Sequence, residues 1–281
     1  RPVVRPVAVP ADRDDAGGQD GPPADRAALA SRVEVLRHRD VARLSAVERE
    51  QVARLVAALT PAGPQRLSRR RRPSRRGPAY PRRTLRAMLA RGGEPDRPRR
   101  HDRTVRPRRL VLLVDVSGSM TPYADLLLRF AHAACRARPG TECFTVGTRL
   151  TRVSRELARR DPQAALTAVA AAVPDWSGGT RLGEELKEFL DRWGQRGLAR
   201  GAVVVLASDG WERGDPALLG AQLERLRRLA HRVVWVNPHK GRHGYLPLTA
   251  GMQAALPHVD DLVAGHSLAA LQHLVAVLAR P

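Results

Sequence analysis

Short apolar stretches without polar alternation constrain the fold more than any other feature of this chain. Three are well defined, at 110–114, 202–207 and 232–236, and a fourth at 142–146 is weaker. A strand that is apolar on both sides must be covered on both faces, as strands of parallel sheets are. A further run at 261–264 is expected to form an edge strand.

Segments long enough for helices separate these runs. They cover 123–137, 162–173, 182–193, 216–230 and 267–279. Alternating strands and helices predict an α/β fold with a doubly wound, mostly parallel sheet of the Rossmann-like kind, which we assign to residues 109–281. In such folds ligands bind beyond the carboxyl ends of the strands.

Three loops at these predicted strand ends or helix starts carry side-chain oxygens. They are Asp115-Val-Ser-Gly-Ser119, Ser177-Gly-Gly-Thr180 and Ser208-Asp-Gly210. Each alone is typical of a turn or a helix cap. Together they offer carboxylates and hydroxyls without His or Cys, a donor set that suits Mg²⁺ or Mn²⁺ better than Zn²⁺. The sequence therefore predicts a divalent-cation site at one edge of the sheet.

The N-terminal part has a different texture. Residues 1–23 are rich in Pro, Gly and Asp and are expected to be a disordered tail. Residues 24–65 show apolar residues at helical spacing and are expected to form a helical hairpin. Ser45 followed by Glu48 is a capping-box pattern, so the second helix is expected to begin there.

Most of the positive charge lies in one stretch. The 281 residues carry a net charge of +21, and residues 66–109 hold 18 arginines and 3 acidic residues, a net of +15. Because Pro and Gly interrupt it, residues 66–108 are expected to be an extended basic linker, with one short helix at 82–90. This linker could grip nucleic-acid phosphates, dock on an acidic protein surface, or simply be solvated. Tyr80 is its one aromatic residue, which disfavours base stacking.

Several classes of protein are not expected. No apolar run approaches the roughly 20 residues of a membrane-spanning helix, and no secretory signal is visible, so we expect a cytoplasmic location. Cys135 and Cys143 cannot form a disulfide scaffold. A Walker A motif, a Gly-x-Ser-x-Gly elbow and a dinucleotide fingerprint are all missing, so an enzyme is not expected.

The oxygen-bearing positions carry a resemblance to a known family. Asp115, Ser117, Ser119, Thr180 and Asp209 match the metal-ion-dependent adhesion site (MIDAS) of von Willebrand factor A (VWA) domains. The chain resembles, more narrowly, the CoxE-like branch of bacterial and archaeal VWA proteins, from about residue 25 onward. The stretches that carry this narrower resemblance are Arg82-Arg-Thr-Leu-Arg86, 115–120, Pro174-Asp-Trp-Ser-Gly-Gly-Thr180, Ser208-Asp-Gly-Trp-Glu-Arg-Gly-Asp215 and Pro257-His-Val-Asp-Asp261.

The resemblance implies a function as well as a fold. Proteins similar to this chain are encoded beside MoxR-type AAA+ ATPases and are thought to help them mature metalloenzymes, notably molybdenum hydroxylases of the carbon monoxide dehydrogenase type. In that setting the VWA protein is an adaptor and not a catalyst. Its bound ion leaves one position open for an Asp or Glu of a partner. The alternative is a nucleic-acid-binding protein acting through the arginines of 66–109.

Four more residues bear on the site. Trp176 and Trp211 flank the predicted ion and are candidate partner contacts, although they could merely shield the loop bases. His239 and His243 lie four residues apart, but without a nearby Cys we expect a surface loop and not a second metal site.

Overall fold

The computed structural model of the chain describes residues 33–61, 63–94, 97–173, 176 and 179–281. The predicted tail 1–23 and the start of the predicted hairpin, 24–32, lie outside these residues. The chain divides into two units, Arg1–Val35 and Leu36–Pro281. In the first unit, residues 33–35 are described and are helical. All other elements belong to the second unit.

A six-stranded sheet forms the centre of the second unit, in the order β5-β4-β3-β6-β7-β8. Only the pair β4 and β5 is antiparallel; the other neighbours run parallel. The predicted doubly wound, mostly parallel sheet is therefore confirmed, with the 261–264 strand at an edge. The bounds are Leu110–Asp115 (β3), Glu142–Val146 (β4), Thr151–Arg152 (β5), Val203–Ala207 (β6), Arg232–Asn237 (β7) and Asp261–Ala264 (β8).

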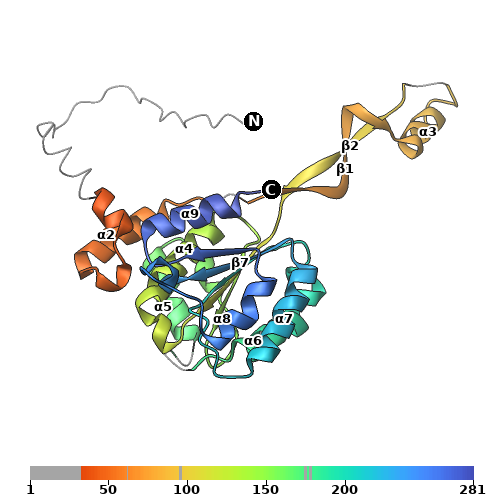
Figure 1. Cartoon of the computed structure of the whole chain (residues 1–281). Helices are drawn as coiled ribbons and strands as arrows, with labels where there is room; N and C mark the ends of the chain where they lie inside the picture. The colour runs from red at the N-terminus through yellow and green to blue at the C-terminus, as the bar shows by residue number, and fades with distance from the viewer. Residues whose placement is uncertain (1–32, 62, 95–96, 174–175, 177–178) are drawn as a thin grey trace, which may run out of the picture. The chain divides into compact units, whose positions relative to one another are not determined.

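Helices cover both faces of the sheet (Figure 1). Along β3, Leu112 and Val114 face one core, whereas Val111 and Leu113 face the other, because successive side chains of a strand point to opposite sides. The first core is completed by α4 (Thr121–Ala137), α5 (Pro162–Ala172) and α9 (Leu268–Leu278). The second is completed by α6 (Leu182–Phe189), α7 (Pro216–Leu229) and α8 (Ala250–Ala255).

The second helix of the predicted hairpin, α2 (Ala46–Ala57), begins where the sequence indicates. The Ser45 hydroxyl accepts a hydrogen bond from the Glu48 amide, and the Glu48 carboxylate accepts one from the Ser45 amide. The reciprocal bonds satisfy two amides that a helix start leaves unpaired. Val52 and Val56 of this helix are buried in the first core.

The prediction that 66–108 is a linker without regular strands is wrong. Two antiparallel strands form there, β1 (Gln65–Ala79) and β2 (Arg100–Pro107), and α3 (Pro81–Leu89) lies between them, close to the predicted 82–90 helix. Pro is tolerated because both strands of a two-stranded ribbon are edges. The register shifts between Ser74 and Ala79, where Gly77 has a φ of 98°. A Cβ at Gly77 would lie 2.5 Å from the His101 carbonyl oxygen.

Three further elements depart from the sequence-based prediction. The helix expected at 182–193 continues past α6 as a π-type segment, η4 (Leu190–Leu198), and the short elements β5 and α8 were not predicted. Two-residue and six-residue elements carry too few positions to show a period. Within the described parts of the chain, no helix combines the length and apolar character needed to cross a membrane.

The two cores give the first prediction. Leu113→Ala removes a side chain that is 1% exposed in β3, so the lost burial and the cavity left behind should lower the free energy of unfolding by about 3 kcal/mol. Leu85→Ala, at a position that is 57% exposed on α3, is the matched control and should change it by less than about 0.5 kcal/mol. Urea denaturation measures both; similar losses would contradict the assigned packing.

Candidate metal centre

Asp115, the last residue of β3, lies at the junction of the three predicted loops. Its carboxylate oxygen Oδ1 accepts hydrogen bonds from the Ser117 amide at 2.9 Å and from the Thr180 hydroxyl at 3.1 Å. Its Oδ2 accepts one from the Ser208 hydroxyl at 2.6 Å. The first, second and third loops are therefore joined through one carboxylate, although 93 positions separate Asp115 from Ser208.

The Asp115 carboxylate is fully buried. Burial raises the pKa of Asp115, the hydrogen bonds from Ser208 and Ser117 oppose that rise, and the nearby charge of Asp209 adds to it. A second carboxylate facing a buried one disfavours ionisation of both. A cation at this place would reverse the effect, since it compensates both charges.

Ser117 and Ser119 place two hydroxyls side by side. Their Oγ atoms are 3.3 Å apart, and Ser117 is buried whereas Ser119 and the intervening Gly118 are exposed. The cluster thus has a buried side around Asp115 and Thr180 and an accessible side at Ser119. Ser177 and Gly178 of the second loop lie outside the described residues.

The third loop is held against β7. Trp235 Nε1 donates to the Ser208 carbonyl at 2.8 Å, and Asn237 Nδ2 donates to the Asp209 carbonyl at 3.0 Å. Gly210 follows with a φ of 79°, and a Cβ there would lie 2.5 Å from the Met252 side chain. The loop therefore requires glycine at this position. These bonds fix the backbone from which the Asp209 side chain projects.

Asp209 is 8% exposed, and its charge acts on the buried Asp115 carboxyl. Its Oδ1 accepts from the Trp211 amide at 2.9 Å, and its Oδ2 lies 3.8 Å from His239 Nε2. The pKa of His239 is lowered, chiefly by burial and then by Arg242, while Asp209 opposes that change. His239 thus borders the cluster from a short 3₁₀ turn, whereas His243 is exposed on the following segment.

Sequence reasoning assigned no role to several residues around the cluster. The sequence predicts Ser208 as part of the third loop and not as a ligand, yet its hydroxyl forms the shortest hydrogen bond to the Asp115 carboxylate. Asn237 follows a predicted strand, as the oxygen-bearing loops do, and that position was the available signal. Glu185 and Glu212 sit on or before helices with nothing in the sequence to mark them.

Glu185 and Glu212 are two further acids close to Asp115. The Glu185 carboxylate accepts from the Gly147 amide at 2.9 Å, and that of Glu212 accepts from the Gly183 amide at 2.9 Å. Burial, partly opposed by the Gly147 bond, raises the pKa of Glu185 to about 8. Burial also raises the pKa of Glu212, against hydrogen bonds from Gly214 and Gly183. The cluster is therefore bordered by four carboxyls, while the imidazole of His239 lies 3.8 Å from Asp209 and the Arg213 side chain lies beside Gly179 of the second loop.

The two candidate partner residues are exposed. Trp211 is 62% exposed and adjoins Asp209. Trp176 is 38% exposed, and its Nε1 donates to the Ala170 carbonyl at 3.3 Å. Both rings are therefore accessible to a partner.

The donor chemistry fits a hard cation. The residues at hand are two carboxylates and the hydroxyls of Ser117, Ser119 and Thr180. Within the described residues, no three His, Cys, Asp or Glu side chains gather in a way that could hold a metal ion, so the candidate ligands are a mixed set of carboxylates and hydroxyls. Oxygen ligands with room for water are what Mg²⁺ and Mn²⁺ prefer.

The raised pKa of Glu185 predicts a pH-dependent stability. Between the ordinary value of 4.5 and about 8, folded Glu185 keeps a proton that the unfolded chain releases, so its contribution is complete below pH 4.5 and is lost as pH rises through 8. Glu185→Gln cannot titrate, and it should reduce the fall in unfolding free energy between pH 5 and 8 by a few kcal/mol. Urea denaturation in chelator at several pH values measures this; parallel curves for variant and parent would contradict it.

The sequence matches the family described as "VWA domain containing CoxE-like protein" over residues 50–271. No curated protein matches the chain. Similar solved structures include proximal thread matrix protein 1 from the mussel byssus with a zinc-occupied MIDAS motif, at 17% identity and a TM-score of 0.42, covering 61% of this chain and 44% of that one.

Two other solved structures are also similar. A von Willebrand factor type A protein from Catenulispora acidiphila is 18% identical with a TM-score of 0.42, covering 64% of this chain and 43% of that one. The SpRpn10 VWA domain is 17% identical with a TM-score of 0.39, covering 60% of this chain and 93% of that one. The chain spans less than half the length of the first structures it matches. Because the family match covers 222 of the 281 residues, the chain belongs to the VWA domain containing CoxE-like proteins.

Proposed function

We propose that this protein is a non-catalytic cytoplasmic adaptor whose VWA domain binds Mg²⁺ or Mn²⁺ and recruits an acidic group of a partner. The ion would be held by Asp115, Ser117, Ser119, Thr180 and Asp209. The observation that carries the proposal is the set of hydrogen bonds from three separate loops to the buried Asp115 carboxylate. A zinc-occupied MIDAS motif is named for the mussel byssus protein, which agrees with a divalent ion in a fold of this kind.

Different residues of the chain would have different roles at the ion. Asp115 gathers the loops, and the hydrogen bond from Ser208 orients its carboxylate. Asp209 supplies the second negative charge from a loop fixed by Trp235 and Asn237. When bound, the ion would supply a positive centre with a coordination position for a carboxylate oxygen of another protein. Exposed Ser119 marks the side from which that oxygen would approach.

The surface beside this side supports recognition of a protein. Trp211, Leu246 and Leu248 are 62%, 65% and 69% exposed. Leu248 adjoins Thr249, whose hydroxyl donates to the Gly210 carbonyl at 3.0 Å, so these apolar groups border the third loop. Aromatic residues next to a fully desolvated contact are favoured at interface hot spots. An acidic group ringed by apolar residues is the complementary partner surface.

The family suggests which partner to test. Membership of the CoxE-like proteins supports a MoxR-type AAA+ ATPase as the working partner and maturation of a molybdenum hydroxylase of the carbon monoxide dehydrogenase type as the process.

Ser119→Ala tests the adaptor function with little risk to the fold. Ser119 is exposed, and within the described part of the chain its hydroxyl forms a hydrogen bond with the hydroxyl of Ser117 alone. In Mg²⁺ the full chain should capture a purified MoxR-type ATPase from the same organism, and capture should fall at least about tenfold in Ser119→Ala or in chelator. Pull-down followed by quantitative immunoblotting measures the captured fraction.

The matched control is Ser74→Ala on β1, whose hydroxyl accepts only from the Arg76 amide. It should capture as much ATPase as the parent. Equal capture by Ser119→Ala and parent in Mg²⁺, or capture that survives chelator, would contradict metal-bridged recruitment.

A further inference from the structure

A polar cavity lies at the other end of the central sheet from the candidate metal centre. It has a volume of about 500 Å³ and is lined where the strands begin, by Leu110 of β3, by Thr141 just before β4 and by Gly201 just before β6. Asp115 is the opposite end of β3, about 17 Å away at 3.3 Å per residue. The cavity is therefore separate from the candidate metal centre and independent of the proposed function.

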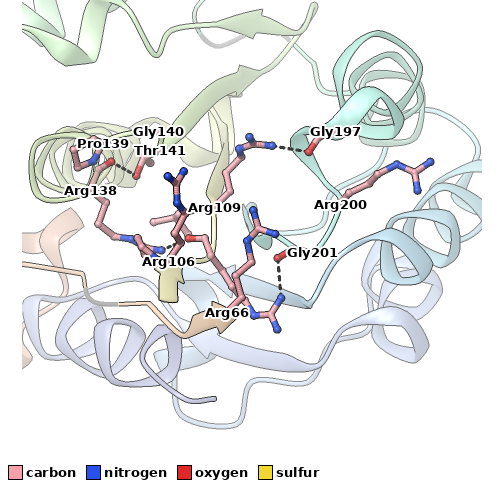
Figure 2. A pocket seen from close by; sticks show the side chains of 13 residues that line it. Arg66, Arg106, Arg109, Arg138, Pro139, Gly140, Thr141, Gly197, Arg200 and Gly201 are labelled. Atoms are coloured by element: carbon pink, nitrogen blue, oxygen red, sulfur yellow. Dashed lines mark hydrogen bonds between the residues drawn. The ribbon is translucent and has the colours of Figure 1, made fainter. Parts of the chain in front are cut away.

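Six arginines from four segments line this cavity, five of them labelled in Figure 2, and no acidic residue lines it. They come from β1, from β2 and the turn after it, from the end of α4, and from the turn after η4. They are Arg66, Arg106, Arg108, Arg109, Arg138 and Arg200.

Four of these arginines donate side-chain hydrogen bonds to neutral carbonyl oxygens. Arg109 donates to Gly197 at 2.5 Å, Arg108 to Gly201 at 3.3 Å, Arg200 to Gln195 at 2.9 Å, and Arg138 to Arg108. None of the six forms an ion pair within the described part of the chain, although thirteen other ion pairs are formed there. Carbonyl bonds orient the guanidinium groups and leave their charge uncompensated.

Arg138 shows the imbalance most clearly. It is 9% exposed, and its Nη1 is buried without a hydrogen-bond partner. The Nε of Arg108, beside it, is buried and without a partner as well. Burial lowers the pKa of Arg138. A buried charge normally has an opposite charge or a full set of hydrogen bonds, and these two groups have neither. Both atoms are buried, and Arg138 Nη1 lies against Gly63, so the two guanidinium groups bring positive charge to the cavity wall without an acidic partner.

The positive field reaches a neighbouring residue. The pKa of His231 is lowered, first by burial and next by the charges of Arg108 and Arg232. This agrees with a locally positive potential where the strands begin.

We propose that this cavity binds the phosphate groups of a small, multiply phosphorylated molecule. Guanidinium groups match phosphate oxygens in pairs, which a point-charge lysine does not. The cavity volume lies within the range of small-molecule sites. Six positive charges are suited to several phosphate charges and exceed what a single carboxylate would balance.

The lining argues against a nucleic-acid strand as the occupant. It consists of Arg, Pro, Gly, Thr and Leu, and it holds no aromatic side chain on which a base could stack. The arginines of α3, such as Arg83 and Arg86, are exposed and do not line the cavity. A nucleic acid drawn by charge alone would involve these exposed arginines as much as those of the cavity.

Isothermal titration of the full chain with inorganic tripolyphosphate tests the proposal. The parent should bind it at physiological salt and bind sulfate more weakly. Arg109→Met with Arg200→Met keeps the apolar stems and removes two guanidinium groups, so it should weaken tripolyphosphate binding at least about tenfold. Arg83→Met with Arg86→Met removes the same charge outside the cavity and should leave the affinity within about twofold.

Circular dichroism of both double variants checks that they are folded. If Arg109→Met with Arg200→Met is not folded, Arg106→Met replaces it. Arg106 is exposed and lines the cavity, so this variant should weaken tripolyphosphate binding severalfold. Absence of tripolyphosphate binding by the parent, or equal affinities in parent and cavity variants, would overturn the proposal. So would a 20-nucleotide single strand that binds more tightly than tripolyphosphate and loses affinity equally in both double variants, because that pattern assigns the arginines to nucleic acid.

Discussion

Burial of the Asp115 carboxylate is the interaction on which the arrangement of this VWA domain depends. The residue ends the central strand of a parallel sheet and is covered on both faces, so water cannot solvate its charge. Hydrogen bonds from Ser117, Thr180 and Ser208 take the place of that water, and they draw three loops to one point. A buried charge of this kind is costly without compensation. The buried Asp115 charge requires compensation, and this requirement both holds the three loops together and makes the site suited to a cation.

The two ends of the sheet have opposite character. At the carboxyl ends of the strands lie Asp115, Asp209, Glu185 and Glu212; burial, and then neighbouring negative charges, raise the pKa values of Asp115, Glu185 and Glu212. Where the strands begin, arginines line a cavity, and the hydrogen-bond acceptors of Arg108 and Arg109 are neutral carbonyl oxygens. A cation at the first end and a polyanion at the second would each relieve an electrostatic imbalance. In the proposed scheme, the two ends of the sheet hold separate sites for ligands of opposite charge.

The sequence predicted those parts of the fold that repeat a local pattern. Buried strands are continuous apolar runs, and the capping box at Ser45 marks a helix start, so both could be found from neighbouring residues. The 65–107 ribbon could not, because its arginines hide the strand pattern and its pairing joins residues such as Gln65 and Pro107. For the candidate centre, the sequence indicated Asp115, Ser117, Ser119, Thr180 and Asp209. It could not indicate that Glu185 would reach Gly147, since that contact depends on how a helix packs on the sheet.

The central claim is that one divalent ion is shared by side chains from three loops, and the anomalous scattering of Mn²⁺ tests it most directly. Crystals of the full chain soaked in MnCl₂ should show an anomalous peak at ligand distance from the Ser117 and Ser119 hydroxyls, with Thr180 and the carboxylates of Asp115 and Asp209 around it. A fully soaked crystal with no peak there, or with its peaks only at other carboxylates, would contradict the account.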